Sequence, residues 1–258
     1  MGIIEGITEF LPVSSTGHLI LAGRFLGLAQ TDFLKTFEIA IQLGAILSVA
    51  VVYFKTLFTS RAIIERIAVA FLPTAFFGAL LYKIVKEVFL ESDRLIAWSL
   101  LLGGIAILIF EWREARKQKT KKEESKIQAE IALAEDISFK KSFWIGVFQS
   151  LAMIPGVSRS GATIIGGMAL GVSRKNIVEF SFLLAFPTML AATCLDVWKS
   201  REVFTSDNIS LLAVGFVFSF LVAWLAIKFF LNFIRKNTFI IFGFYRILVG
   251  FLLLIFFI

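Results

Sequence analysis

The sequence has little cysteine, histidine, proline or charge. Its 258 residues include one cysteine, one histidine and four prolines, and only 17% are charged. The single cysteine, Cys194, excludes an intramolecular disulfide, so cysteine usage says nothing about the redox compartment. No Lys/Arg-led segment followed by a small-residue cleavage site opens the chain, so a removable signal peptide is not expected.

Apolar side chains are abundant instead. The chain is 58% hydrophobic, has a mean hydropathy of +0.87 and contains 30 phenylalanines. A soluble domain of this length cannot bury that much apolar surface. The composition therefore predicts an all-α, polytopic membrane protein with lipid as a partner. The net charge of +7 lies in loops between apolar runs, a pattern that reports membrane orientation, so no nucleic-acid partner is expected.

Six apolar runs are long enough to cross a membrane. A hydrocarbon core about 30 Å thick needs about 20 helical residues. The six predicted transmembrane helices cover residues 36–54, 62–82, 95–112, 177–195, 209–228 and 238–258.

Two further apolar stretches, 2–28 and 143–171, are interrupted by polar turns. Each divides into two helices of about ten residues, and such a helix spans about 15 Å, half the hydrocarbon thickness. We therefore predict two re-entrant helical hairpins, whose exposed backbone must be buried in protein or line a wet cavity.

The two hairpins resemble each other. A shift of 144 residues aligns 2–27 with 146–171 without a gap and gives 8 identities in 26 positions, where about two are expected from composition. The chain is therefore interpreted as a single integral membrane domain, 1–258. It comprises repeat half one (2–112), a cytoplasmic linker (113–141) and repeat half two (142–258). Because each half has three crossings, the repeat is expected to be inverted, as in many transporters.

Loop charges predict the orientation. The loops that the topology places on one side carry 15 Lys and Arg residues, against six on the other. The positive-inside rule assigns the richer side to the cytoplasm. The first hairpin then opens to the outer face and the second to the cytoplasm.

The first hairpin carries a pair of carboxylates, Glu5 and Glu9, one helical turn apart. Ionisable residues inside a membrane are functional candidates by default. A bare carboxylate pair repels phosphate unless a cation or proton lies between them, and such oxygen ligands suit Mg²⁺ or Ca²⁺.

Both hairpins also place hydroxyl groups at the start of a helix. Gly/Ser-rich helix N-termini bind anions through free N–H groups, and arginine adds a rigid set of donors for phosphate. Together these groups predict a phosphate-handling site at mid-membrane depth. The residues in question are Ser14, Ser15, Thr16 and His18 in the first hairpin and Ser158, Arg159, Ser160 and Thr163 in the second.

Each of these features also has a purely structural interpretation. A Glu pair can be solvated, serines before a helix often serve only as caps, and a lone histidine is often structural. Arg159 can extend its charge to the interface. Glu38 and Gln42, again one turn apart, either support the site or bond only to a neighbouring helix.

Two long motifs resemble those of a known family. The segments 5–18 (EGITEFLPVSSTGH) and 155–163 (PGVSRSGAT) resemble the two signature motifs of the undecaprenyl-pyrophosphate phosphatases of the bacitracin-resistance type. The stretches 36–44 and 245–247 are similar as well, so the likeness covers essentially the whole chain.

This resemblance implies a hydrolase of the bacterial plasma (inner) membrane, assisted by a divalent cation. Its substrate would be undecaprenyl pyrophosphate, and its product the monophosphate carrier lipid used in peptidoglycan synthesis. Bacitracin resistance follows, because the drug sequesters the pyrophosphate lipid. Carried over by position, Glu5 and Glu9 match the family's acidic pair, Ser14, Ser15 and His18 its serines and histidine, and Ser158, Arg159 and Thr163 its phosphate contacts.

The resulting hypothesis is metal-assisted phosphoryl hydrolysis on the outer leaflet. Ser15 attacks phosphorus and His18, at i+3, takes its proton, although the resemblance leaves His18 open as the nucleophile. The alternative is a secondary transporter or flippase for an anionic polyprenyl lipid, which needs the arginine but no nucleophile. A scaffold protein is a third reading, which the number of intramembrane polar groups disfavours. A homodimer is left open.

Overall fold

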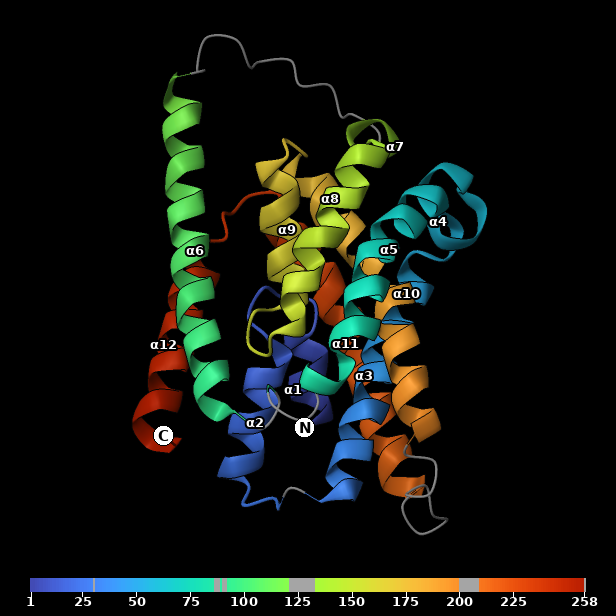
Figure 1. Cartoon of the computed structure of the whole chain (residues 1–258), viewed down its shortest axis with the longest axis vertical. Coiled ribbons are helices and arrows are strands. Elements are labelled where there is room, and N and C mark those ends of the chain that lie inside the picture. The colour runs from blue at the N-terminus through green and yellow to red at the C-terminus, as the bar shows by residue number, and fades with distance from the viewer. Residues whose placement is uncertain (30, 86–88, 90–91, 121–132, 200–208, 258) are drawn as a thin grey trace.

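A computed structural model describes residues 1–29, 31–85, 89, 92–120, 133–199 and 209–257, and every regular element in these ranges is helical. The long helices run roughly along the longest axis of the molecule (Figure 1). They are α3 (Asp32–Val52), α5 (Arg61–Ile84), α6 (Asp93–Thr120), α10 (Arg174–Lys199), α11 (Ile209–Ile234) and α12 (Ile240–Phe257).

Each of the six predicted spans overlaps one of these helices. Five of them are long and apolar enough to cross a membrane, so the chain is a multi-pass membrane protein. The remaining helix, α12, is apolar but shorter, with 18 residues, which corresponds to about 27 Å.

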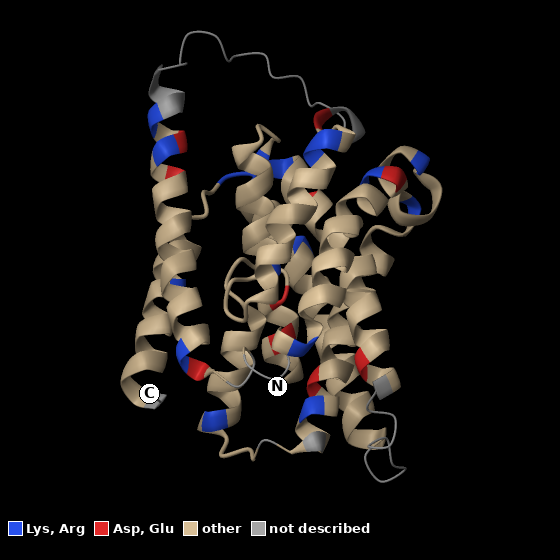
Figure 2. Ribbon diagram, viewed as in Figure 1, with Lys and Arg blue, Asp and Glu red and all other residues tan. Residues whose placement is uncertain are grey.

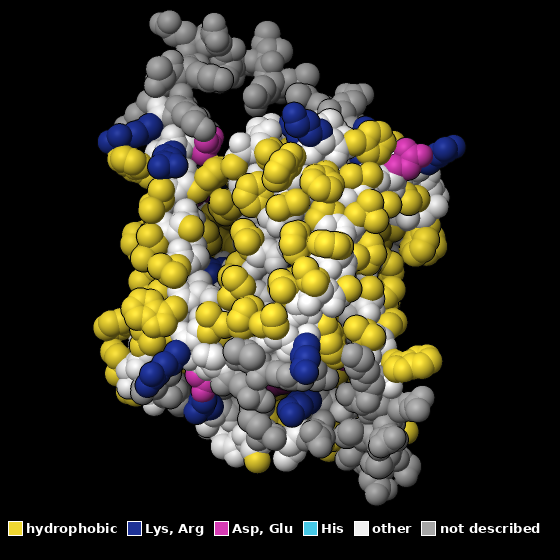
Figure 3. All heavy atoms as spheres, in the orientation of Figure 1, with side chains coloured by type: hydrophobic (Ala, Val, Ile, Leu, Met, Phe, Trp, Pro, Cys, Tyr) yellow, Lys and Arg dark blue, Asp and Glu magenta, His cyan; other side chains and the backbone are white. Residues whose placement is uncertain are grey.

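Charge and apolar surface are separated along the same axis. Lys, Arg, Asp and Glu gather toward the two ends of the molecule, with few between them (Figure 2). Apolar side chains cover the visible face between those ends (Figure 3). An apolar band of this kind is what a hydrocarbon environment requires.

Both predicted hairpins consist of two short helices around a turn. The first is α1 (Gly2–Thr8) and α2 (Ser15–Phe25). The second is α8 (Phe139–Ser150), continued by a 3-10 turn at Leu151–Met153, and α9 (Arg159–Ala169). None of these helices is long enough to cross a bilayer alone.

The segment predicted as a linker, 113–141, contains more helix than expected. Helix α6 continues to Thr120, and α7 (Leu133–Asp136) and the start of α8 lie in the same segment. The residues after Trp112 include alanine, glutamate, arginine and lysine, which favour helix without an apolar face. Residues 121–132 lie outside the described part of the chain. A short helix, α4 (Phe54–Thr59), follows α3.

The two hairpin turns share backbone details at positions 144 residues apart. Ser14 and Ser158 both adopt positive φ, 69° and 73°. Gly27 and Gly171, which end α2 and α9, have φ of 64° and 76°. Both helices close with the same hydrogen bond, from Leu28 N–H to Gly23 in one and from Val172 N–H to Gly167 in the other. Glycine suits this helix ending because it lacks the Cβ that disfavours a left-handed residue.

Each hairpin packs against a long helix from the other part of the chain. Helix α1 lies on α11 and α8 lies on α5. Glycine permits both close approaches: a Cβ at Gly2 would lie 2.6 Å from the carbonyl oxygen of Gly215, and one at Gly146 would overlap the carbonyl of Ala70. This exchange brings the hairpins into the middle of the bundle.

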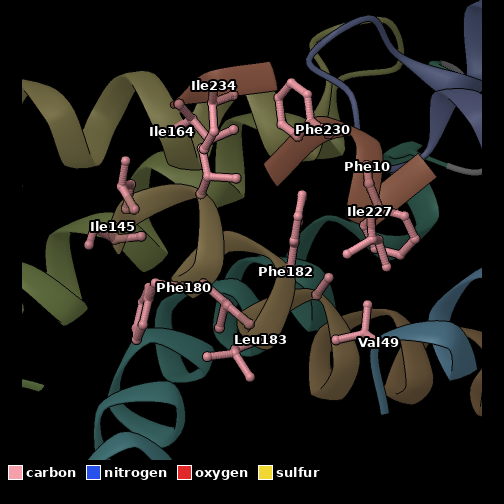
Figure 4. Close-up of a cluster of buried hydrophobic side chains, with 14 of the residues drawn as sticks. Phe10, Val49, Ile145, Ile164, Phe180, Phe182, Leu183, Ile227, Phe230 and Ile234 are labelled. Carbon is pink, nitrogen blue, oxygen red and sulfur yellow. The ribbon is translucent and has the colours of Figure 1, made fainter. Parts of the chain in front are cut away.

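Beside the hairpins lies a cluster of buried phenylalanine and aliphatic side chains (Figure 4). Phe10, in the first turn, packs edge-on against Phe182 of α10, with 5.3 Å between ring centroids. Phe182 in turn contacts Phe230 of α11. The turn that carries the site is thus fixed to the helices around it.

Candidate active site

The tips of the two hairpins meet inside the bundle, near mid-height in Figure 1. Ser160 Oγ, from the second hairpin, donates a hydrogen bond to the carbonyl oxygen of Leu11, in the first, at 2.8 Å. Buried carbonyls need such donors, because no water is available to them in hydrocarbon.

Arg246 of α12 holds the two turns together. Its side chain is only 1% exposed. Within the described part of the chain, all of its hydrogen-bond acceptors are backbone carbonyls. The acceptors from the hairpins are Pro12 (3.3 Å), Gly156 (2.8 Å) and Val157 (2.9 Å). Ser99 and Leu100 of α6 supply two more.

Glycine makes room for this guanidinium. A Cβ at Gly103 of α6 would overlap the Nη2 atom of Arg246. The next residue, Gly104, approaches Arg246 as well, because a Cβ there would lie 3.1 Å from the arginine Cβ.

Glu9, Ser15 and Arg159 form the centre of the site. Arg159 Nη2 lies 3.1 Å from Glu9 Oε1, although 150 residues separate them. Ser15 Oγ donates to the other carboxylate oxygen, Oε2, at 2.6 Å. A buried carboxylate that accepts a serine proton is the arrangement in which a hydroxyl becomes a nucleophile.

Arg159 is held from behind by α10. Its Nη1 donates to the carbonyl of Ser181 at 2.9 Å. The Ser181 hydroxyl is in turn 2.6 Å from Thr163 Oγ1, and the ring of Phe10 lies 5.6 Å from the guanidinium carbon. The Nε atom of Arg159 has no hydrogen-bond partner in the described part of the chain. Arg159 therefore has donor capacity left for a ligand.

A cavity of about 270 Å³ opens beside this centre. Seven of the residues singled out from the sequence line it: Glu9, Ser14, Ser15, Thr16, Gln42, Ser158 and Arg159. Polar side chains that the sequence did not single out line it as well: Thr74 of α5, Gln149 of α8, and Thr188, Thr193 and Asp196 of α10.

The other singled-out residues lie outside the lining. Ser160 and Thr163 are fully buried, and their hydroxyls donate to the carbonyls of Leu11 and Arg159. Both hydroxyls were expected to contact phosphate. In the structure they lie behind the surface of the cavity and bond to the protein instead. Glu5 is fully buried behind Glu9, and Glu38 of α3 is half-buried away from the lining.

His18 also differs from expectation. It was expected to take the proton of Ser15, but its Nδ1 lies 2.8 Å from the carbonyl of Ser14 and its Nε2 lies 2.8 Å from the hydroxyl of Tyr245. A carbonyl only accepts, so Nδ1 carries a proton, and in the neutral ring Nε2 then accepts from the tyrosine hydroxyl. The ring therefore supports the strained Ser14 backbone, and Glu9 takes the place beside Ser15.

The acidic pair fits a divalent cation in part. No group of three or more His, Cys, Asp or Glu side chains gathers as a metal site among the residues described. Both carboxylate oxygens of Glu5 are nevertheless buried beside Glu9, and no other described side chain donates a hydrogen bond to them. Two such charged groups are unfavourable unless a cation or a proton lies between them. Mg²⁺ commonly uses one or two carboxylates and completes its shell with water and phosphate. Glu5 and Glu9 suit that mode of binding.

Three functional candidates were missed from the sequence. Arg246 and Tyr245 were quoted only as part of a resemblance, although an arginine inside the last apolar run is itself a signal of function. Gln149 aligns with Glu5 under the 144-residue shift, and that alignment was the available clue.

The sequence model of the family described as "Bacitracin resistance protein BacA" matches residues 1–252. The chain belongs to the BacA family. Among curated relatives, a protein of Aquifex aeolicus is 50% identical over 250 residues, covering 97% of this chain and 93% of its own. One of Wolinella succinogenes is 50% identical over 254 residues, covering 98% and 94%. One of Persephonella marina is 50% identical over 256 residues, covering 99% and 96%. All three BacA relatives are named undecaprenyl-diphosphatase.

Proposed function

We propose that this protein is an undecaprenyl-diphosphatase, which hydrolyses undecaprenyl pyrophosphate to undecaprenyl phosphate and inorganic phosphate. The observation that carries the proposal is the hydrogen bond from Ser15 to Glu9, with Arg159 on the other carboxylate oxygen, in one cavity. The relatives' shared name supports it. Bacitracin resistance is the expected consequence, because the enzyme removes the pyrophosphate lipid that the drug binds.

The chain's own residues supply a nucleophile, a base and an anion site. Ser15 Oγ forms a bond to the terminal phosphorus and its proton passes to Glu9 Oε2. The bond from phosphorus to the bridging oxygen breaks, and the lipid monophosphate leaves with the electron pair. Arg159 and the N-terminus of α9 stabilise the charge that develops on the phosphoryl oxygens, while Ser14, Thr16 and Ser158 line the space around them.

A divalent cation, Mg²⁺ or Ca²⁺, would be held by Glu5 and Glu9. When bound it would supply Lewis-acid stabilisation of the phosphate oxygens. The buried oxygens of Glu5 beside Glu9 support this assignment. Gln42 also lines the cavity and would support the site from α3, with Glu38 one turn earlier.

We also propose an inverted repeat with six crossings and two re-entrant hairpins in the bacterial plasma membrane. The support is the matched φ values, helix endings and exchanged helix contacts at positions 144 residues apart. Residues 2–112 and 142–258 would be the two halves, joined by 113–141. With the positive-inside orientation, the first hairpin opens outward and hydrolysis takes place at the outer leaflet.

A transporter or flippase for an anionic polyprenyl lipid is the second candidate, because broken helices in a repeat are typical of transporters. It has no need of a serine hydrogen-bonded to a carboxylate. The deciding experiment is phosphate release from a polyprenyl pyrophosphate by purified protein in detergent with Mg²⁺, where no gradient exists.

Three variants complete that experiment. Ser15→Ala and Arg159→Ala are expected to lower phosphate release at least about a hundredfold. Thr59→Val, on the exposed helix α4, serves as the control and keeps wild-type release. A folded wild type that releases no phosphate would favour the transporter. A scaffold would instead leave growth under bacitracin unchanged in Ser15→Ala and Arg159→Ala cells.

A further inference from the structure

Gln149 carries a buried acceptor that the proposed mechanism does not yet use. Its side chain is 2% exposed and lines the cavity that also holds Glu9, Ser15 and Arg159. Its Oε1 has no hydrogen-bond partner in the described part of the chain. An unpaired amide oxygen inside a protein is unfavourable by about 1–3 kcal/mol, so a ligand that satisfies it is expected.

The neighbouring hydrogen bonds fix which end of the amide is free. Thr74 Oγ1 donates its single proton to the carbonyl of Gly146, at 3.2 Å. It can therefore only accept from Gln149, whose nitrogen lies 2.9 Å away. The nitrogen is thus turned to Thr74, and the oxygen is the end left without a partner.

An amide oxygen restricts the class of ligand. It accepts hydrogen bonds and cannot donate them, so it repels ionised phosphate oxygens and requires an O–H or N–H donor. Polar side chains contribute to the lining of the cavity, which is large enough for several waters. Gln149 comes from the hairpin opposite Ser15, and the 144-residue shift places it where the first hairpin has Glu5.

We infer that Gln149 Oε1 binds the water that hydrolyses a phosphoseryl intermediate at Ser15. This inference rests on the proposed function. The water donates one proton as a hydrogen bond to Gln149, and its oxygen forms a bond to phosphorus. The bond from phosphorus to Ser15 Oγ breaks. Glu9 returns the proton that it took from Ser15 to Oγ, then accepts the other water proton and releases it to solvent, and the hydroxyl group leaves as part of hydrogen phosphate.

The test separates the two half-reactions. Polyprenyl pyrophosphate labelled in its terminal phosphate is mixed with excess wild-type or Gln149→Met enzyme in detergent and Mg²⁺. The reaction is quenched in acid, and lipid monophosphate, free phosphate and protein-bound label are measured over time. In Gln149→Met, lipid monophosphate is expected at the wild-type rate, while free phosphate appears about tenfold to a hundredfold more slowly. The missing label is found on the protein.

Two further variants guard against misfolding. Gln149→Glu keeps an acceptor oxygen and is expected to restore release of free phosphate to within a few-fold of wild type. Thr74→Val removes the partner that fixes the amide and is expected to accumulate less label than Gln149→Met. Ser150→Ala is the matched control: this hydroxyl, on the next residue of α8, donates to Gly146 and does not line the cavity.

The outcomes distinguish the two proposals. A wild type that forms no lipid monophosphate overturns the proposed function. If the wild-type enzyme turns over and the Gln149→Met enzyme shows the same kinetics, only the water site is overturned. A raised KM with both products slowed equally also overturns it, because the amide then contacts the substrate.

Discussion

Ser14 and Ser158 lie 144 residues apart and share the same unusual backbone conformation, with φ of 69° and 73°. Each immediately precedes the first residue of a helix, Ser15 in one hairpin and Arg159 in the other. The proposed nucleophile, Ser15, and the proposed phosphate-binding side chain, Arg159, thus occupy equivalent positions in the two hairpins. Left-handed φ in a residue with a Cβ is unfavourable by about 1–2 kcal/mol and is commonly found at functional sites.

Glycine substitution should separate backbone strain from capping at these serines. Ser158 Oγ accepts from Gly161 N–H at 3.1 Å, whereas Ser14 makes no such cap. Ser14→Gly is therefore expected to raise stability by about 0.5–1 kcal/mol, because it removes strain without losing a cap. Ser158→Gly should be close to neutral, because the lost cap offsets the relief. Thermal unfolding in detergent measures both, and equal shifts would contradict the assignment of strain and cap.

Arg246 is expected to be essential for the geometry of the site. Arg246→Met leaves five buried carbonyls short of a donor, so a loss of about 2–4 kcal/mol of stability is predicted. Phosphate release should fall about a hundredfold or more, because both turns lose their common support. Arg246→Lys, with a compact ammonium, should recover only part of either property.

The control for that experiment is Arg235→Gln, an exposed arginine at the end of α11, which should behave as wild type. An Arg246→Met protein that matched this control in both melting temperature and phosphate release would show that the two turns hold without the guanidinium.

Asp136 should make stability depend on pH at the end of the molecule assigned to the cytoplasm. Burial raises the pKa of its carboxyl, but hydrogen bonds from Ser173 N–H and the Asn176 amide, together with Lys141, lower it more. The pKa therefore lies below its ordinary value of 3.8. A depressed pKa means that the stabilisation is present above about pH 4 and is lost as the pH falls below it.

The corresponding measurement is melting temperature at pH 7 and pH 3. Asp136→Asn is expected to melt about 2–4 °C below wild type at pH 7 and to approach it at pH 3. Glu65→Gln, which removes an exposed partner of Arg61, should change little at either pH. A constant gap between Asp136→Asn and wild type at both pH values would refute the linkage.

Much of the fold was predictable because hydropathy and repeats are local properties. The spans follow from run length, and the hairpins follow from polar turns that divide apolar stretches. The polar groups of both hairpins were predicted to serve one phosphate site, and Glu9 and Arg159, one from each hairpin, lie 3.1 Å apart.

The contacts that the sequence did not reveal join residues that lie far apart in it. Helical spacing put His18 on the same face as Ser15. Spacing does not reveal that Tyr245 of α12 forms a hydrogen bond with the His18 ring. The acceptors of Arg246 in the two turns are backbone carbonyls up to 234 residues away, and backbone groups leave no mark in a side-chain pattern. The unpaired oxygen of Gln149 likewise becomes visible only when the neighbouring donors are placed.

The most direct test of the central claim, that residues of both hairpins serve one phosphate site, is a double-mutant cycle between Glu9 and Arg159. Phosphate release from a polyprenyl pyrophosphate is measured as kcat/KM for wild type, Glu9→Gln, Arg159→Ala and the double variant. Each single change should lower kcat/KM about a hundredfold or more, and the double variant should fall less than about tenfold below the worse single. A double variant whose loss equals the product of the two single losses would contradict a shared site.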